Sequence, residues 1–166
     1  MAEDMPVTIR YTRMEDARDI RPWFDESEII RWFPCIDTWE VDDSLHRWVS
    51  FCRYRASLSA VCDGKVVGLC TLYLQPYRKL IHHCELGIIV APSMRGRGVG
   101  TALMTELEKL AREQFKIEVL SLQVYYGNPA IRLYERMGFV EYGRQDKWIR
   151  EPDGEYTGRI FMQKEL

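Results

Sequence analysis

A glycine-rich stretch carries the densest chemical signal in this sequence. Residues 90–101 read VAPSMRGRGVGT, with an apolar run before them and a helical pattern after them. Glycines remove the side chains that would keep an anion away from the free N–H groups of a helix's first turn, and the helix dipole favours negative charge there. Arg95 and Arg97 add positive charge at the same place. The stretch therefore predicts a phosphate or pyrophosphate site.

The spacing of the glycines excludes two common phosphate-binding loops. A Walker A motif needs Gly-Lys followed by Ser or Thr, a combination that the sequence lacks. The dinucleotide fingerprint G-x-G-x-x-G would need a glycine at position 101, where Thr101 stands. The spacing that is present is R-x-x-G-x-G, from Arg95 to Gly100.

Hydrophobic periodicity predicts the elements that position this loop. Strands are expected over 6–13, 57–63, 66–75, 83–91 and 117–125, with two more in 139–166. Helices are expected over 14–24, 42–56 and 98–115, and from Asn128, a good N-cap before Pro129, to Gly138. This order predicts an α/β (α+β) fold with a mixed, mostly antiparallel sheet of about seven strands and about four helices.

Composition narrows the class of protein. The chain has 166 residues, enough for a single domain over 1–166, and 23 basic against 25 acidic residues give a net charge of −2, which argues against a nucleic-acid binder. The longest uncharged stretch, 66–77, is too short for a membrane span, and the opening MAEDMPV lacks the features of a secretory signal. Five widely spaced cysteines and three histidines predict reduced thiols, no metal site and a cytoplasmic protein.

Three segments together resemble the acetyl-CoA-binding core of the GNAT N-acetyltransferase superfamily. They are the predicted strand ELGIIVAP, the R-x-x-G-x-G loop and the later NPAIRLYERMGF. The resemblance covers residues 60–145 well and the outer segments only by element order. It implies a GNAT fold whose sheet splays between its fourth and fifth strands, 83–91 and 117–125, with the pantetheine arm of acetyl-CoA in the gap.

The resemblance also implies roles for individual residues. Strand residues Ile88, Ile89 and Val90 and the loop residue Asn128 would contact the pantetheine arm, with the Val90 N–H facing the thioester oxygen. The pyrophosphate would bind the backbone N–H groups of Arg95, Gly96, Arg97, Gly98, Val99, Gly100 and Thr101. Tyr134 would contact the cofactor and protonate the departing thiolate. Each of these also has a plain structural interpretation: buried strand residues, a solvated glycine turn, a helix N-cap and a core tyrosine.

The sequence departs from the family pattern at the general base. Ribosomal-protein N-terminal acetylases of this fold often carry a glutamate on the strand before the Asn-containing loop, but the aligned residue here is Gln123, which cannot take a proton. Glu85 is the nearest replacement, because other members place a carboxylate there that acts through water. A salt-bridged edge residue is the alternative interpretation of Glu85.

The acceptor is expected to be a primary amine. Residues 25–43 hold seven acidic residues against Arg31, interleaved with Trp32, Phe33 and Trp39. Such a wall would attract a cationic amine, although a charge run is more often a solvated face. Only a neutral amine attacks a thioester, so the α-amine of a peptide or protein N-terminus, with its lower pKa, is favoured over a lysine, and small amines remain open.

These expectations add up to an N-acetyltransferase that transfers an acetyl group from acetyl-CoA by direct attack in a ternary complex. The alternative is a non-catalytic acyl-CoA-binding or sensing domain, which Gln123 keeps open. The sequence leaves monomer and homodimer equally open.

Overall fold

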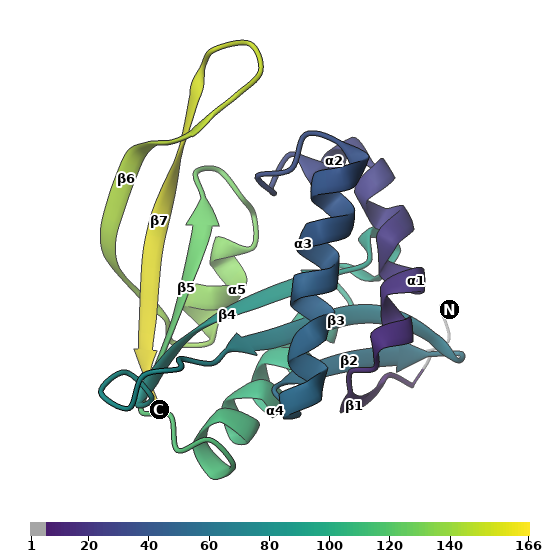
Figure 1. The fold of residues 1–166 in the computed structure, drawn as a ribbon, viewed down its shortest axis with the longest axis vertical. Helices are drawn as coiled ribbons and strands as arrows, with labels where there is room; N and C mark the ends of the chain where they lie inside the picture. The colour runs from purple at the N-terminus through teal and green to yellow at the C-terminus, as the bar shows by residue number, and fades with distance from the viewer. Residues whose placement is uncertain (1–5) are drawn as a thin grey trace.

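A single mixed sheet of seven strands organises the computed structural model, which describes residues 6–166 (Figure 1). The opening residues 1–5, on which the expectation about a secretory signal partly rests, lie outside the described part. The strand order is β1-β2-β3-β4-β5-β7-β6, and every neighbouring pair is antiparallel except β4 and β5. The strands are β1 Thr8–Tyr11, β2 Ser57–Cys62, β3 Lys65–Tyr73, β4 His83–Val90, β5 Val119–Tyr125, β6 Val140–Arg150 and β7 Tyr156–Glu165.

Helices cover both faces of the first four strands (Figure 1). On one face α4 (Val99–Glu113) buries Leu103, Met104 and Leu107 against the sheet, because its apolar residues recur on one stripe. On the other face α1 (Ala17–Ile20), α2 (Ser27–Ile30) and α3 (Thr38–Ser50) enclose a second core around Ile20 and Val49. Helix α5 (Ile131–Arg136) follows β5, and the β6–β7 hairpin extends beyond the helices.

The predicted fold class is confirmed, and the differences from it lie in the helices. The expected helix over 14–24 is a short α1 between two 3-10 turns, Met14–Asp16 and Arg21–Asp25, and α2 is an additional short helix. Helix α3 begins at Thr38 rather than residue 42, because the Asp37 side chain accepts from the Glu40 N–H at 2.8 Å and caps it. It ends at Ser50 and continues as a 3-10 turn over Phe51–Tyr54.

The sheet opens between β4 and β5, as predicted. These two strands pair in parallel over only three residues each, His83–Glu85 with Val119–Ser121. Beyond Glu85 and Ser121 they diverge, while β4 stays paired with β3 as far as Val90 and β5 stays paired with β7 as far as Tyr125. The second halves of β4 and β5 therefore face a gap rather than each other.

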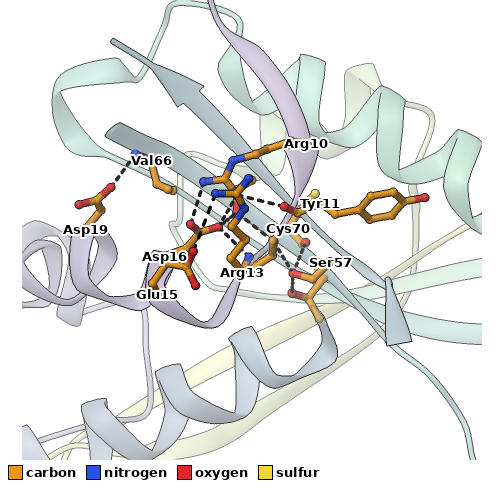
Figure 2. A network of polar contacts seen from close by, with 12 residues as sticks. Arg10, Tyr11, Arg13, Glu15, Asp16, Asp19, Ser57, Val66 and Cys70 are labelled. Carbon is orange, nitrogen blue, oxygen red and sulfur yellow. Dashed lines mark hydrogen bonds and ion pairs between the residues drawn. The ribbon is translucent and has the colours of Figure 1, made fainter. Parts of the chain in front are cut away.

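A buried polar network attaches the N-terminal helices to the sheet (Figure 2). The Asp16 carboxylate, only 3% exposed, accepts two hydrogen bonds of 2.8 Å from the Arg10 guanidinium. It also accepts from the Ser59 hydroxyl at 2.7 Å and the Arg13 N–H at 3.0 Å. Burial alone would raise the pKa of Asp16, but these hydrogen bonds outweigh it, so the pKa is lowered.

Within residues 6–166, no helix combines the length and the apolar character that crossing a membrane requires.

Candidate active site

A cleft of about 490 Å³ runs from the glycine loop through the gap between β4 and β5 to the helices on the other face of the sheet. Most of the residues predicted for the site line it. These are Ile88, Ile89, Val90, Arg95, Gly96, Gly98, Val99, Gly100, Thr101, Asn128 and Tyr134. The side chains of Arg97 and Glu85 are not part of the lining. The three segments that the sequence separates are thus brought to one cavity.

Backbone groups of β4 are directed into the gap. Ala91 donates its N–H to Val67 O at 2.9 Å, and antiparallel ladder bonds alternate along a strand. Hence the N–H and C=O groups of Ile89 face β3, while those of Ile88 and Val90 point toward β5, which has moved away. Buried backbone groups without a strand partner need another partner. Ile89 also lines the cleft, but its backbone groups are paired with β3 and it is buried in the second core.

The glycine loop offers a cluster of free N–H donors. Helix α4 begins at Val99 after Gly98, which has a φ of +79° and acts as its N-cap. In the described chain, the N–H groups from Gly96 to Thr101 donate to no acceptor, as expected for a loop and a helix's first turn. A Cβ at Gly98 would point into open space, whereas one at Gly100 would meet Leu133 Cδ2 at 2.9 Å. The arrangement suits a pyrophosphate, with Arg95 alongside.

Asn128 and Tyr134 face the cleft from the loop and helix after β5. The Asn128 side-chain oxygen accepts from the Ala130 N–H at 2.9 Å, so it holds the turn, while helix α5 itself begins at Ile131 with Ala130 as its N-cap. Its amide nitrogen has no partner within residues 6–166. The Tyr134 ring packs edge-on against Phe139, and its hydroxyl likewise has no partner there. Burial raises the pKa of Tyr134 to about 12.

Three polar side chains lie in a row across β4, β5 and β7. The Gln123 amide donates to the Glu85 carboxylate at 2.7 Å, and its oxygen accepts from the Arg159 guanidinium. Gln123 lines the cleft, and Glu85 lies next to it, half-buried. Burial raises the pKa of Glu85, although the Gln123 hydrogen bond and the Arg159 charge offset part of the shift. A carboxylate of raised pKa beside a cleft is suited to accept a proton.

The segment 25–43 divides into an aromatic part that lines the cleft and an acidic part that does not. Trp32 and Phe33, with Ile29 and Trp48, form the wall opposite the sheet. Trp39, also expected in this wall, is 72% exposed and does not line the cleft. Six of the seven acidic side chains have partners, namely Asp25 and Asp42 with Arg21, Asp43 with Arg47, Glu28 with Arg95, and Asp37 and Glu40 with backbone N–H groups, and none of the seven lines the cleft. The solvated-face interpretation of the charges therefore holds.

Sequence reasoning missed two groups at this site. Tyr125, the last residue of β5, lines the cleft with a buried hydroxyl that has no hydrogen-bond partner in the described structure. Arg159, on β7, touches Gln123 from a segment 36 residues away in the sequence. Neither lies in a motif, and only the pairing of Tyr125 with Arg159 across β5 and β7 brings them together.

Comparison with known proteins agrees with this geometry. Over 162 residues the chain is 28% identical to an L-amino acid N-acetyltransferase of Escherichia coli, covering 95% of this chain and 97% of that protein. A solved ribosomal-protein-alanine N-acetyltransferase of Brucella melitensis is 28% identical, with a TM-score of 0.77 over 96% of this chain and 99% of that one. A Salmonella typhimurium protein solved with its cofactor acetyl-CoA has the same fold, at 21% identity and a TM-score of 0.80 over 96% and 94%.

The family assignment rests on a match that covers most of the chain. Residues 14–139 match the sequence model of the Acetyltransferase (GNAT) family, a span that includes the glycine loop, both splayed strands, Asn128 and Tyr134. Acetyl-CoA is the acetyl donor of this family. Among residues 6–166, no cluster of histidine, cysteine, aspartate or glutamate side chains could hold a metal ion. The chain is a member of the GNAT acetyltransferase family.

Proposed function

We propose that residues 1–166 form one acetyltransferase domain that transfers an acetyl group from acetyl-CoA to a primary amine. The observation that carries this proposal is the gap beyond Glu85 and Ser121, where β4 presents unpaired backbone groups to a cleft that ends at the glycine loop. In this proposal the pantetheine arm lies in the gap, with Ile88 and Val90 as its backbone partners. Asn128 contacts the arm with its free amide nitrogen.

The pyrophosphate would lie against the loop and the start of α4. The N–H groups from Gly96 to Thr101 would donate to it, and the absence of a side chain at Gly98 keeps the approach open. The Arg95 N–H, also expected to bind the pyrophosphate, donates to Pro92 O at 3.3 Å instead. Arg95 lines the cleft and is held near Glu28 at 3.8 Å, a loose pair that a pyrophosphate would outcompete. Arg97 would contribute its backbone N–H, because its side chain lies outside the cleft lining.

The chemistry would proceed by direct attack. The neutral amine nitrogen forms a bond to the thioester carbonyl carbon, and the Val90 N–H stabilises the developing oxyanion. The C–S bond then breaks, Tyr134 protonates the departing thiolate, and Glu85 takes a proton from the amine nitrogen through a water molecule. The products are the N-acetylated amine and free CoA.

The acceptor in this proposal is an α-amine rather than a lysine side chain. At pH 7 an unperturbed lysine is about one part in 2,500 neutral, whereas an α-amine of pKa near 7.8 is more than a tenth neutral. The two relatives that are 28% identical carry names with acceptors of this kind, an L-amino acid and a ribosomal-protein alanine. A site in which the base is a carboxylate that acts through a water molecule suits the amine that loses its proton more easily.

Two measurements test the proposal in sequence. Acetyl-CoA at about 100 times its Kd should stabilise the fold by about 2.7 kcal/mol and raise the melting temperature by roughly 5–10 °C, while NAD should leave it unchanged. Thiol release from acetyl-CoA should then require an added α-amine. Binding without any amine-dependent thiol release would favour the acyl-CoA-sensing alternative, and no binding would reject both.

A further inference from the structure

Arg159 is a positively charged group that contacts the cleft residue Gln123 and has no negative partner among residues 6–166. Its guanidinium lies 3.3 Å from the ring centroid of Trp148 and 4.3 Å from that of Phe161. These aromatic contacts fix the plane of the group. No carboxylate of the described chain lies within ion-pair distance of it, whereas Arg144 on the neighbouring strand is paired with Glu141 at 2.6 Å.

The hydrogen bonds of Arg159 leave a specific pair of donors free. A guanidinium has five N–H groups. Arg159 donates one from Nη1 to Gln123, and one each from Nε and Nη2 to the Gln145 side-chain oxygen, at 3.3 and 3.0 Å. One N–H therefore remains on each terminal nitrogen. Two donors on neighbouring nitrogens are what a carboxylate accepts in a bidentate pair.

The surroundings of Arg159 point to a ligand. Tyr125 stands opposite Arg159 in the β5–β7 register and lines the cleft. Its hydroxyl is buried and unpartnered within the described residues, and a buried hydroxyl of this kind is expected to find its partner in a bound molecule. This end of the cleft thus offers a fixed cation and a neutral donor side by side.

The charged side chains on these strands are also complementary to the two charged groups of an amino acid. Glu85 on β4 and Arg159 on β7 both contact the side-chain amide of Gln123 on β5, Glu85 at its nitrogen and Arg159 at its oxygen. A carboxylate and a guanidinium on either side of one amide are placed to attract the ammonium and the carboxylate of one α-amino acid. Such a molecule would lie over Gln123 with its amine toward Glu85 and the β4 gap.

We infer that Arg159 binds the carboxylate of the acceptor, and that the acceptor is a free α-amino acid with an apolar side chain rather than a protein N-terminus. The inference rests on the proposed acetyl transfer and names its substrate class. An amine carried by a peptide has an amide where the free amino acid has its carboxylate, and would leave the guanidinium without a counter-ion. The apolar wall of Ile29, Trp32 and Phe33 would take the side chain.

A cycle of enzyme and substrate changes tests this assignment. The substrates are apolar L-amino acids and, for each of them, the corresponding amino acid amide. The value of kcat/KM is measured for every substrate with the wild type and with Arg159→Gln. The ratio of amino acid to amide should fall roughly 10- to 100-fold in the variant, the usual effect of a charged hydrogen-bonded pair. The substrate carboxylate changes the pKa of the amine equally for both enzymes, and Arg159 acts on Glu85 equally for both substrates. Both effects therefore cancel when the two ratios are compared.

Arg144→Gln is the matched control, because it removes a guanidinium that is already paired with a carboxylate. It should leave the ratio unchanged, and both variants should keep the wild-type KM for acetyl-CoA and a cooperative melting transition. Arg159→Lys should recover part of the ratio, since it restores the charge without the two-pronged geometry.

Three outcomes would overturn the assignment. One is an unchanged ratio in Arg159→Gln. The second is faster acetylation of an amidated dipeptide, or of glucosamine 6-phosphate, than of every free amino acid. The third, no acetylation of any amine by a protein that binds acetyl-CoA, would reject the proposed acetyl transfer itself and is thereby distinguished from the first two.

Discussion

Burial acts in the same direction on Tyr134 and Glu85, with opposite consequences for their chemistry. Removing either group from water disfavours its anion, so both pKa values rise. For the phenol this keeps the proton in place at any working pH, as a general acid needs. For the carboxylate it increases the proton affinity, which a general base needs.

We predict that Tyr134→Phe lowers kcat by about 10²-fold or more, the range expected when a general acid is removed. The change deletes one hydroxyl that has no partner in residues 6–166 and keeps the ring packed on Phe139. Binding of acetyl-CoA and the melting temperature should therefore be retained. Tyr142→Phe, at a tyrosine 55% exposed on β6, is the control. If the chemical step limits turnover and kcat is unchanged, Tyr134 is a packing residue only.

We predict that Glu85→Gln separates activity from stability. The pKa of Glu85 is raised in the folded state, so the folded protein binds this proton more tightly than the unfolded chain does. The contribution of Glu85 to stability is therefore present below its unfolded pKa and is lost as the pH rises through the folded pKa. At pH 7 the neutral variant should melt at a higher temperature while kcat falls by about 10²-fold. Glu106→Gln on the exposed face of α4 should change neither. A fully active variant would exclude Glu85 as the base.

At the scale of elements, the start of α4 should bind acetyl-CoA through its backbone. Gly98→Ala places a methyl group in front of the free N–H groups and should weaken binding at least about tenfold. The same change strains a residue with φ near +79°, at a cost of about 1 kcal/mol. Gly64→Ala is the matched control, because Gly64 has a φ of +76° and equally open space in the β2–β3 turn. Equal affinities in the two variants would exclude the loop as the pyrophosphate site.

Elements with a strong local pattern could be predicted from the sequence, and elements held by tertiary contacts could not. The apolar stripe of α4, the Asp63-Gly64 hairpin and the strand before the glycine loop each carry their own signal. In the segment 14–24, the break after Ile20 has a local cause that the periodicity overlooked, because Pro22 lacks the N–H that would continue the helix. Asp16 in the same segment is drawn into the network with Arg10 and Ser59, which depends on residues far apart in the chain. Arg159 was missed for the same reason, since its place beside Gln123 is set by the pairing of β7 with β5.

For the molecule as a whole, the Asp16 network should govern how the N-terminal helices are held on the sheet (Figure 2). Asp16→Asn leaves the partly buried Arg10 without its counter-ion and should cost about 2 kcal/mol of unfolding free energy at pH 7. Because the folded pKa of Asp16 is lowered, its stabilisation is present above the unfolded pKa and lost as the pH falls through the folded pKa.

Denaturant unfolding of Asp16→Asn and wild type at several pH values checks this prediction. The difference in free energy should shrink as the pH is lowered below about 4, the usual range of an aspartate. Glu15→Gln, at a neighbouring carboxylate with only a 3.9 Å pair to Arg13, is the control and should stay within about 0.5 kcal/mol of wild type. A pH-independent difference would show that packing, not charge, holds this part of the molecule.

The central claim is that the gap between β4 and β5 is the acetyl-CoA site, and amide hydrogen exchange tests it most directly. The N–H groups of Ile88 and Val90 face the gap, whereas the N–H of Ala91 donates to Val67 and serves as the internal reference. Saturating acetyl-CoA should slow exchange at Ile88 and Val90 by at least about tenfold more than at Ala91. Equal slowing at all three positions, or none, would contradict the account.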